Sequence, residues 1–469
     1  MLLDIHPGLP PAARRRQNAL RLGRATILAM IALGTVVAAT AIWVRSQGIP
    51  AFRTYDGGLG SLGLLTGLLA SDLVIIQVLL IARIPWVETA WGHDVLLRYH
   101  RWVGFASFWF MIAHVYTYTV LRVEGARGAL SDRLWQLFVT NPWMLFATIG
   151  TIMLIAVVVS SIRNARRRLR YESWHFLHLY AYLGMAFAFP HQLFDGRIFH
   201  GTWSRFFWWG IYILAAAAIV IFRLGLPLWR SWYHQLRVSN VRSEAPGIVS
   251  IAMSGQRLDR LDVRSGQFFI WRFLSGGGLG WATGHPYTLS AAPTDDHLRI
   301  TIQDAGDWSH RVARLREGTR VLIEGPYGVM TADRRRHRRL LCIAAGVGIT
   351  PMRALLADAD YAPGDATLIY RVGSPDQTIF HDELDAIATA RGVDVIYVSG
   401  PRASQSSWLP AGPDGWDQDG VAVLRELIPD VADRDVFICG PSGWMSLVRK
   451  SLRQAGVARR DIHTENFSW

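Results

Sequence analysis

Cysteine is scarce in this chain of 469 residues, which holds only Cys342 and Cys439. Two cysteines provide no disulfide framework, and without paired CxxC patterns the common zinc and dithiol sites are excluded. The sequence also has no acidic loop of the EF-hand type, so we expect no control by calcium. No long regulatory insertion is present, and the expectation is constitutive activity or control by a separate partner.

Charged side chains are sparse in the first half of the chain, whereas the second half reads as an ordinary globular sequence. Hydrophobic residues make up 51% of the whole, and the mean hydropathy is +0.19, which is high for a purely soluble protein. The net charge of +13 comes largely from arginines that flank apolar runs, so the positive-inside rule explains it better than nucleic-acid binding does. The length suggests two to four domains, with a membrane domain first and soluble domains after it.

Six apolar stretches are long enough to cross a bilayer as helices. A basic segment, residues 1–24, precedes the first stretch, which is too long for the core of a cleaved signal peptide. Arginines in that segment and between the fourth and fifth stretches place both termini on the cytoplasmic side of the cell membrane. Asp72 lies in the second stretch, where a hydrogen bond between helices is favoured over a proton path. The predicted spans are 25–44, 58–82, 100–121, 143–162, 174–193 and 206–222.

Histidines occur in two of these spans, where an ionisable side chain is costly and marks a candidate functional site. His100 and His114 are 14 residues apart, close to four helical turns, whereas His178 and His191 are 13 apart and less well aligned. A lone histidine in a span more often bonds a neighbouring helix, but two pairs at similar separations favour axial ligation of haem iron. The sequence therefore predicts two stacked b-type haems. His100 and His178 would hold one near the cytoplasmic face, and His114 and His191 the other near the outer face, with His175 as the alternative to His178.

Residues 236–330 carry short apolar and β-branched runs punctuated by glycine and proline, the pattern of a small β domain. The segment HPYTLS, residues 285–290, offers hydroxyl and backbone donors that can line a flavin in a β-barrel. Ordinary packing of a barrel strand is the alternative explanation of this short motif.

From residue 339 onward, strands and helices alternate as in a parallel nucleotide-binding sheet. An apolar strand leads into a glycine turn and a helix that opens at Thr350 and Pro351, with Thr350 expected as the N-cap. Such a turn lets a phosphate approach the N–H groups at the helix N-terminus. Arg371 and Arg402 each follow a predicted strand, where they can contact a 2′-phosphate, so NADPH is favoured over NADH.

In their order and spacing, these segments resemble the ferric reductase and NADPH oxidase superfamily over about residues 58–469. The histidine-bearing spans are similar to its haem-binding core. HPYTLS, GVGITP and CGP are similar to its flavin segment, phosphate loop and nicotinamide-side segment, and the tail ENFSW resembles its aromatic C-terminus. The resemblance implies an all-α six-helix membrane bundle that binds two haems (25–226), then a β-barrel FAD domain (236–330) and an α/β NAD(P)H-binding domain (339–469).

The resemblance also implies roles for single residues. FAD would be lined by His285, Pro286, Tyr287, Thr288 and Ser290, with Trp308 and Ser309 near its pyrophosphate or adenine. The NAD(P)H phosphates would be held by Gly346, Gly348, Thr350 and Pro351. The nicotinamide would be approached by Cys439, Gly440 and Pro441, and Trp469 would stack on the flavin and move aside. The alternatives are a small buried strand residue for Cys439 and a frayed terminus for Trp469.

The implied function is electron transfer across the membrane, from cytosolic NAD(P)H through FAD and two b-type haems to an acceptor at the outer face. Dioxygen, giving superoxide, is the favoured acceptor, and a ferric chelate, a quinone or a protein partner are the alternatives. A haem subunit that serves a partner enzyme would not need a nicotinamide site, and a proton-relaying transporter would not bind haem. No nucleic acid and no obligatory protein partner is expected.

Overall fold

The computed structural model of the chain describes residues 11–46, 48–123, 131–132, 135, 139–162, 166, 171–194, 201–275, 284–304, 312, 315–404, 406–411 and 419–465. These residues form two compact units. The first is helical and consists of Arg24–Val87 and Val95–Arg223. The second contains Glu88–Asp94 and the chain from Leu224 onward.

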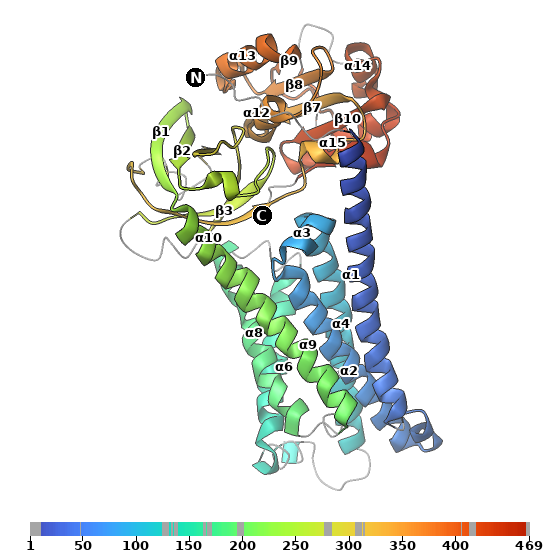
Figure 1. Cartoon of the computed structure of the whole chain (residues 1–469). Helices are drawn as coiled ribbons and strands as arrows, with labels where there is room; N and C mark the ends of the chain where they lie inside the picture. The colour runs from blue at the N-terminus through green and yellow to red at the C-terminus, as the bar shows by residue number, and fades with distance from the viewer. Residues whose placement is uncertain are drawn as a thin grey trace. The chain divides into compact units, whose positions relative to one another are not determined.

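Long helices build the first unit, and Figure 1 shows them running side by side. Asn141 caps one of them by accepting a hydrogen bond from the N–H of Trp143. The helices that carry Gly150 and Gly184 approach each other closely at these two glycines. A Cβ on Gly150 would lie only 2.5 Å from the carbonyl oxygen of Gly184. The helices are α1 (Pro11–Arg45), α2 (Tyr55–Ile81), α3 (Pro85–Trp91), α4 (His93–Val123), α6 (Pro142–Ser161), α8 (Tyr171–Phe194) and α9 (Thr202–Ala218).

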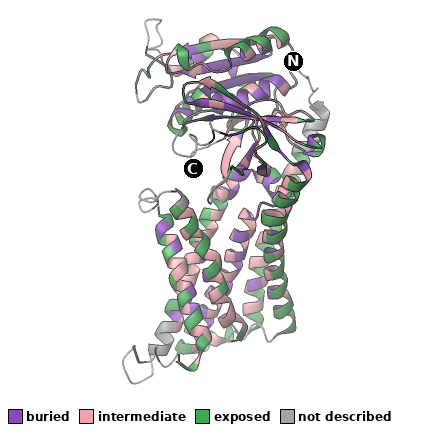
Figure 2. Ribbon diagram, turned by 90° about the vertical axis from the view of Figure 1, so that its left-hand side faces the viewer, coloured by how far each residue is buried: buried purple, intermediate pink, exposed green. Residues whose placement is uncertain are grey.

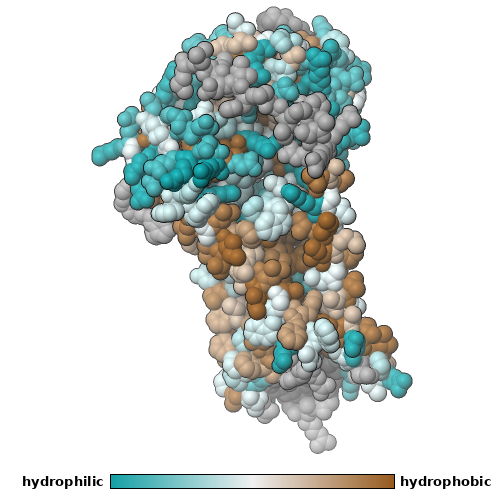
Figure 3. All heavy atoms as spheres, in the orientation of Figure 1, coloured by the Kyte–Doolittle hydropathy of each residue, from teal (hydrophilic) through white to brown (hydrophobic). Residues whose placement is uncertain are grey.

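Each predicted span coincides with one of the long helices, although the bounds differ. Within the described part of the chain, four helices are long and apolar enough to cross a membrane: Ala19–Arg45, Tyr55–Ile81, Pro142–Ser161 and Thr202–His234. The histidine-bearing α4 and α8 are not among them, so the number of six spans stays a prediction. Large apolar side chains such as Ile27, Leu33 and Ile213 are exposed on these helices, and Figure 3 shows apolar surface along them, as expected for contact with lipid.

Beyond α9 the chain continues through a π-helical turn (Ile219–Gly225) into α10 (Leu226–His234), which belongs to the second unit and packs on a strand of that same unit. Ser231 of α10 accepts a hydrogen bond from the N–H of Ile323 at 3.0 Å. Arg230 donates to the carbonyl oxygen of Gly325. Two side chains therefore fasten α10 to the strand.

Two antiparallel three-stranded sheets follow α10. Isolated bridges join Arg237 to Arg320 and Leu289 to Ile300, and the side chains between the sheets form one apolar core that contains Trp271. Closure into a barrel stays a prediction, because the described residues form two separate sheets. One sheet has the order β1 (Arg237–Ala245), β2 (Ile248–Ser254), β5 (His297–Gln303), and the other β4 (His285–Thr288), β3 (Phe268–Phe273), β6 (Val321–Tyr327).

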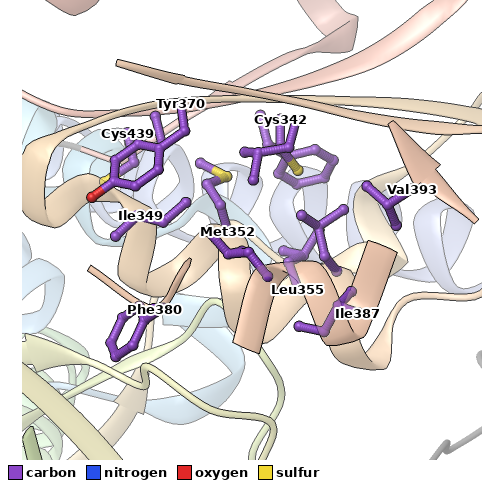
Figure 4. Packing of buried hydrophobic residues seen from close by; sticks show 14 of the residues in the cluster. Cys342, Ile349, Met352, Leu355, Tyr370, Phe380, Ile387, Val393 and Cys439 are labelled. Atoms are coloured by element: carbon purple, nitrogen blue, oxygen red, sulfur yellow. The ribbon is translucent and has the colours of Figure 1, made fainter. Parts of the chain in front are cut away.

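A parallel five-stranded sheet with helices on both faces ends the chain. Alternate residues of its central strand face opposite sides: Cys342 packs under α12 and α13, and Ile343 under α14 and α15. The three central strands are buried over nearly their whole length, whereas the two edge strands are only partly buried (Figure 2). In Figure 4, Met352 of α12 points into the first of the two cores. The order is β11 (Ile462–Thr464), β10 (Arg434–Cys439), β7 (Arg339–Ala345), β8 (Ala366–Val372), β9 (Val393–Ser399); the helices are α12 (Ile349–Asp358), α13 (His381–Arg391), α14 (Gly420–Leu427) and α15 (Ser442–Gln454).

Candidate functional site

The four predicted haem-ligand histidines form two facing pairs between α4 and α8. The ring centres of His100 and His178 are 6.1 Å apart, and those of His114 and His191 are 6.3 Å apart. These are the pairs that the spacing along the two helices predicts. The ring that faces His100 is that of His178, one helical turn beyond His175.

The separation of the rings fits a metal ion between them. A metal bound to two imidazole nitrogens at about 2 Å each, with each ring centre about 1.1 Å behind its nitrogen, gives roughly 6 Å between ring centres. Both pairs have this separation. Opposed imidazoles are a normal axial arrangement for haem iron, so the residues present fit two b-type haems.

The Nδ1 atoms of the α4 histidines are held by backbone carbonyls of α2. Nδ1 of His100 lies 3.0 Å from the carbonyl oxygen of Gln77, and Nδ1 of His114 lies 2.8 Å from that of Gly63. A histidine that donates from Nδ1 presents Nε2 as the metal ligand, and such a partner fixes the orientation of the ring. Sequence reasoning missed this contribution of α2, because backbone carbonyls leave no residue signature.

The Nδ1 atoms of the α8 histidines have partners that are nearer in the sequence than those of the α4 histidines. Nδ1 of His178 lies 3.3 Å from the hydroxyl oxygen of Ser161, at the end of α6. Nδ1 of His191 contacts the carbonyl oxygen of Ala188 in its own helix. All four rings therefore have a neighbour at Nδ1, the arrangement that orients a histidine whose Nε2 binds a metal.

A glycine lets α2 lie against the ring of His114. A Cβ built on Gly67 would lie 2.6 Å from Nδ1 and 2.8 Å from Cε1 of His114. Any larger residue would displace the ring, so the close approach of α2 depends on glycine at this position.

The predicted flavin segment forms strand β4 and the residues just after it. His285 and Tyr287 lie on the same side of the strand, with their rings stacked at 6.4 Å and both half-buried. The carbonyl oxygen of Tyr287 accepts a hydrogen bond from the indole of Trp271 at 2.9 Å, which fixes the backbone of the segment. Pro286, which lies between these two residues in the sequence, is half-buried. Thr288 is buried at the end of the strand.

Ser290 is turned into the protein. It is fully buried, and its hydroxyl oxygen accepts hydrogen bonds from Thr301 at 2.8 Å and from Nε of Arg299 at 3.2 Å. The hydroxyl of Thr301 is in turn 2.7 Å from that of Ser250. This geometry favours a role for Ser290 in bracing the segment over direct contact with a flavin.

The glycine turn of the α/β sheet joins β7 to α12. Gly346 has a φ of +55°, and a Cβ there would meet open space, which leaves the backbone accessible to a ligand. Thr350 is not the N-cap that the sequence suggested: Gly348 occupies that position, and the Thr350 hydroxyl donates to the carbonyl oxygen of Val347 at 3.0 Å. Pro351 consequently lies in the first turn rather than at its start. The helix N-terminus, where a phosphate can bind, still follows the glycines.

Cys439 ends strand β10 beside the glycine turn, and its side chain belongs to the apolar core on one face of the sheet (Figure 4). Burial raises the pKa of the Cys439 thiol, and the nearby Glu465 carboxyl adds to the shift. Burial likewise raises the pKa of Cys342 to about 12. Both thiols therefore stay protonated at neutral pH. The atoms that lie against the turn, around Gly348, are backbone atoms of Cys439 and Gly440.

Glu465, in the tail ENFSW, was not among the residues singled out in the sequence. It is buried, and a Cβ on Gly328 would lie 2.5 Å from its Oε1 atom. Burial raises the pKa of this carboxyl well above its ordinary value. A single acidic residue in a C-terminal tail gives no signal of this environment. Trp308, Ser309 and Trp469 lie outside the described residues.

Arg371 and Arg402 lie at the carboxyl ends of two neighbouring strands, β8 and β9. Nη2 of Arg371 donates to the carbonyl oxygen of Gly400 at 3.2 Å. Burial, with the positive charge of Arg402 as a further cause, lowers the pKa of Arg371. In the described part of the chain neither arginine forms an ion pair, so together they offer a cationic site to an anion.

Three family models match consecutive parts of the sequence. They are "Ferric reductase like transmembrane component" over residues 66–189, "FAD-binding domain" over 235–331 and "Oxidoreductase NAD-binding domain" over 342–450. The chain belongs to the ferric reductase and NADPH oxidase superfamily. It is a multi-pass membrane protein of this superfamily with an FAD-binding domain and an NAD(P)-binding oxidoreductase domain.

Similar proteins match between about two fifths and one half of this superfamily member. Ferredoxin–NADP reductase B of Sorangium cellulosum is 34% identical over 191 residues, which are 39% of this chain and 77% of that protein. A glycine betaine monooxygenase reductase subunit of Chromohalobacter salexigens is 25% identical over 248 residues, 51% of this chain and 65% of that protein. Among solved structures, the FAD/NAD-binding domain of a nitric oxide dioxygenase from Vibrio cholerae aligns with 50% of this chain and 98% of its own, at 22% identity and a TM-score of 0.38.

Proposed function

We propose that the protein transfers electrons across the cell membrane from cytosolic NAD(P)H, through FAD and two b-type haems, to an acceptor at the outer face. The observation that carries this proposal is the pair of facing histidine couples, each with the ring separation of a bis-imidazole iron site. When bound, FAD accepts two electrons from NAD(P)H and the haems carry them singly.

The proposed domain arrangement follows the sequence. A cytoplasmic segment (1–24) precedes a six-helix haem domain (25–226), a FAD domain (236–330) and a NAD(P)H domain (339–469). The basic segments support a cytoplasmic position for both termini. His100 and His114 are 14 residues apart on one helix, so the two ligand pairs are separated by about 20 Å along the helix axis. This spacing suits relay of electrons from one side of the membrane to the other.

In the FAD and NAD(P)H domains, the side chains bind and orient the flavin and the nucleotide. None of them is required as an acid or base. The flavin would lie against His285, Pro286, Tyr287 and Thr288, with Ser290 fixing their backbone, and with Trp308, Ser309 and Trp469 as further contacts. The nucleotide phosphates would lie at Gly346, Gly348, Thr350 and Pro351. Cys439, Gly440 and Pro441 would face the nicotinamide.

Dioxygen is the acceptor we propose, with superoxide as the product. His114 and His191 would hold the haem of the outer site from both sides, and that haem would supply electrons by outer-sphere transfer, for which dioxygen needs no dedicated binding pocket. A ferric chelate or a quinone can accept electrons in the same way, and the two differ from dioxygen in kinetics that can be measured.

The test is anaerobic stopped-flow mixing of purified protein plus FAD with NADPH, with the haem absorbance followed before and after air is admitted. We expect haem reduction, then fast reoxidation accompanied by trapped superoxide. Slow reoxidation in air but fast reoxidation by a ferric chelate would assign a ferric reductase instead. If neither NADPH nor NADH reduces the haems of a fully loaded protein, the electron path is wrong.

Arg371 and Arg402 lead to a prediction about nucleotide choice. If the 2′-phosphate of NADPH binds between them, Arg402→Ala removes a charge-assisted hydrogen bond, of about 1.5–3 kcal/mol, and raises the KM for NADPH about 10- to 100-fold. The KM for NADH stays unchanged. Arg425→Ala, on the exposed surface of α14, is the matched control and leaves both constants as they are. An equal rise in the KM for NADPH and in the KM for NADH would show that these arginines do not recognise the 2′-phosphate.

A further inference from the structure

Glu383, near the start of α13, binds arginines from two different domains. Its two oxygens accept a forked pair of bonds from Arg299 of strand β5, at 2.7 Å to Nη1 and 2.8 Å to Nη2. Its Oε2 atom also lies 2.8 Å from Nε of Arg353 on α12. One carboxylate therefore joins the flavin-binding β domain to the helix that begins at the phosphate turn.

Arg299 also forms hydrogen bonds with Ser290, at the end of the flavin segment. Its Nε atom donates to the hydroxyl of Ser290 at 3.2 Å, and Nη2 donates to the carbonyl oxygen of Ser290 at 3.0 Å. The N–H of Ser290 in turn donates to the carbonyl oxygen of Arg299 at 2.8 Å. Every polar group of Ser290 is thus bound to a residue that Glu383 holds.

The arrangement is too constrained for an ordinary surface ion pair. The side chains of Arg299, Glu383 and Arg353 are exposed by only 20%, 28% and 12%. The guanidinium of Arg299 also lies over the ring of Phe380, 4.9 Å from its centre. Burial alone would raise the pKa of Glu383, but the hydrogen bonds and charges of the two arginines outweigh it and lower that pKa. The carboxyl is therefore ionised, as a forked arginine pair requires.

We propose that Glu383 is a positioning residue that fixes the flavin segment relative to the phosphate-turn helix, so that a nicotinamide bound by that helix meets the flavin. This inference rests on the proposed function. The phosphates would bind at one end of α12, and Arg353 lies in the second turn of the same helix. Glu383, Arg299 and Ser290 then connect that helix to the segment that would carry the flavin.

Glu383→Gln in the full-length protein tests this role. Glutamine keeps the size of the side chain but cannot bind both guanidinium groups as an anion. We expect the rate of flavin reduction at saturating NADPH to fall about tenfold, because misplacement by a fraction of an ångström is enough for a loss of that order. The Kd of NADP⁺ stays within about twofold, because the phosphate turn itself is intact.

A second readout does not depend on activity. In hydrogen–deuterium exchange of the nucleotide-free protein, peptides from 285–303 and 381–391 should exchange faster in Glu383→Gln, while those from β7 and β10 do not change. Arg299→Gln should reproduce both effects, and the double variant should be no slower than either single one, because one connection is broken in all three.

Asp430→Asn is the matched control. Asp430 also accepts from two arginines, Arg339 and Arg434, but all three belong to the α/β domain. Its loss is expected to lower stability without changing the rate of flavin reduction. If Glu383→Gln behaves like Asp430→Asn, Glu383 is merely structural and the inference is wrong. If the wild-type flavin is not reduced by NADPH at all, it is the proposed function that fails.

Discussion

Replacement of His114 or His191 by alanine is expected to remove one of two haems from the protein and to leave the other in place. Each ring would supply one side of the same proposed haem site, with 6.3 Å between their centres, and neither histidine belongs to the pair of His100 and His178. An iron with one axial ligand removed is held far less firmly. The haem content, measured as the pyridine haemochrome per chain, should fall from two to one.

The same argument predicts loss of the other haem in His100→Ala and His178→Ala. His175→Ala is the matched control, because this histidine lies on the same helix one turn away and is not the ring that faces His100. It should keep both haems. Full haem content in His178→Ala together with loss in His175→Ala would exchange the two assignments, and full content in all the variants would remove haem ligation from this protein.

Flavin reduction by NADPH separates these variants from misfolded protein. The FAD and NAD(P)H domains do not use the histidines of α4 and α8, so the reduction rate of the flavin should be unchanged in His114→Ala. Transfer onward to an external acceptor through the membrane should be lost. A variant that loses flavin reduction as well has lost its fold, and its haem content then says nothing about ligation.

The histidine pairs illustrate what a sequence can and cannot predict. Spacing along two helices predicts which rings share a depth in the membrane, but an ideal helix leaves His178 and His191 out of alignment. Pro190, immediately before His191, removes a helical hydrogen bond, so an ideal phase does not apply to the end of α8. The structure therefore presents both rings of α8 toward α4, although simple periodicity does not.

Contacts between residues that are far apart in the sequence could not be predicted from the sequence alone. Glu383 and Arg299 are 84 residues apart, and no local pattern connects an acid in a helix with an arginine in a strand. The HPYTLS motif predicts a flavin segment, yet it does not say that Ser290 points inward. Thr350 has the chemistry of an N-cap and was expected to be one, but the glycine turn extends the helix start to Gly348. For Ser290 and Thr350, the hydrogen bonds made in the folded protein decide the role of the side chain, and the local sequence preference does not.

Gly348 is the position in the α/β domain where a single methyl group should have the largest effect. A Cβ there would lie 2.3 Å from the carbonyl oxygen and 2.6 Å from the carbonyl carbon of Cys439, and 2.9 Å from the nitrogen of Gly440. These are backbone atoms, which cannot rotate away as a side chain does. Gly348→Ala must therefore push the phosphate turn away from the segment that faces the nicotinamide.

We expect kcat/KM for flavin reduction by NADPH to fall about 100-fold in Gly348→Ala, the loss typical of a displacement of about 1 Å. FAD and haem content should stay at the wild-type level, and dithionite should still reduce the haems, because neither cofactor is proposed to touch this turn. Gly443→Ala is the matched control: it lies in the first turn of α15, nothing approaches the added methyl group within 4 Å, and its rate should equal that of the wild type. A Gly348→Ala protein that reduces its flavin at the wild-type rate would show that the contact of the turn with Cys439 does not position the nucleotide.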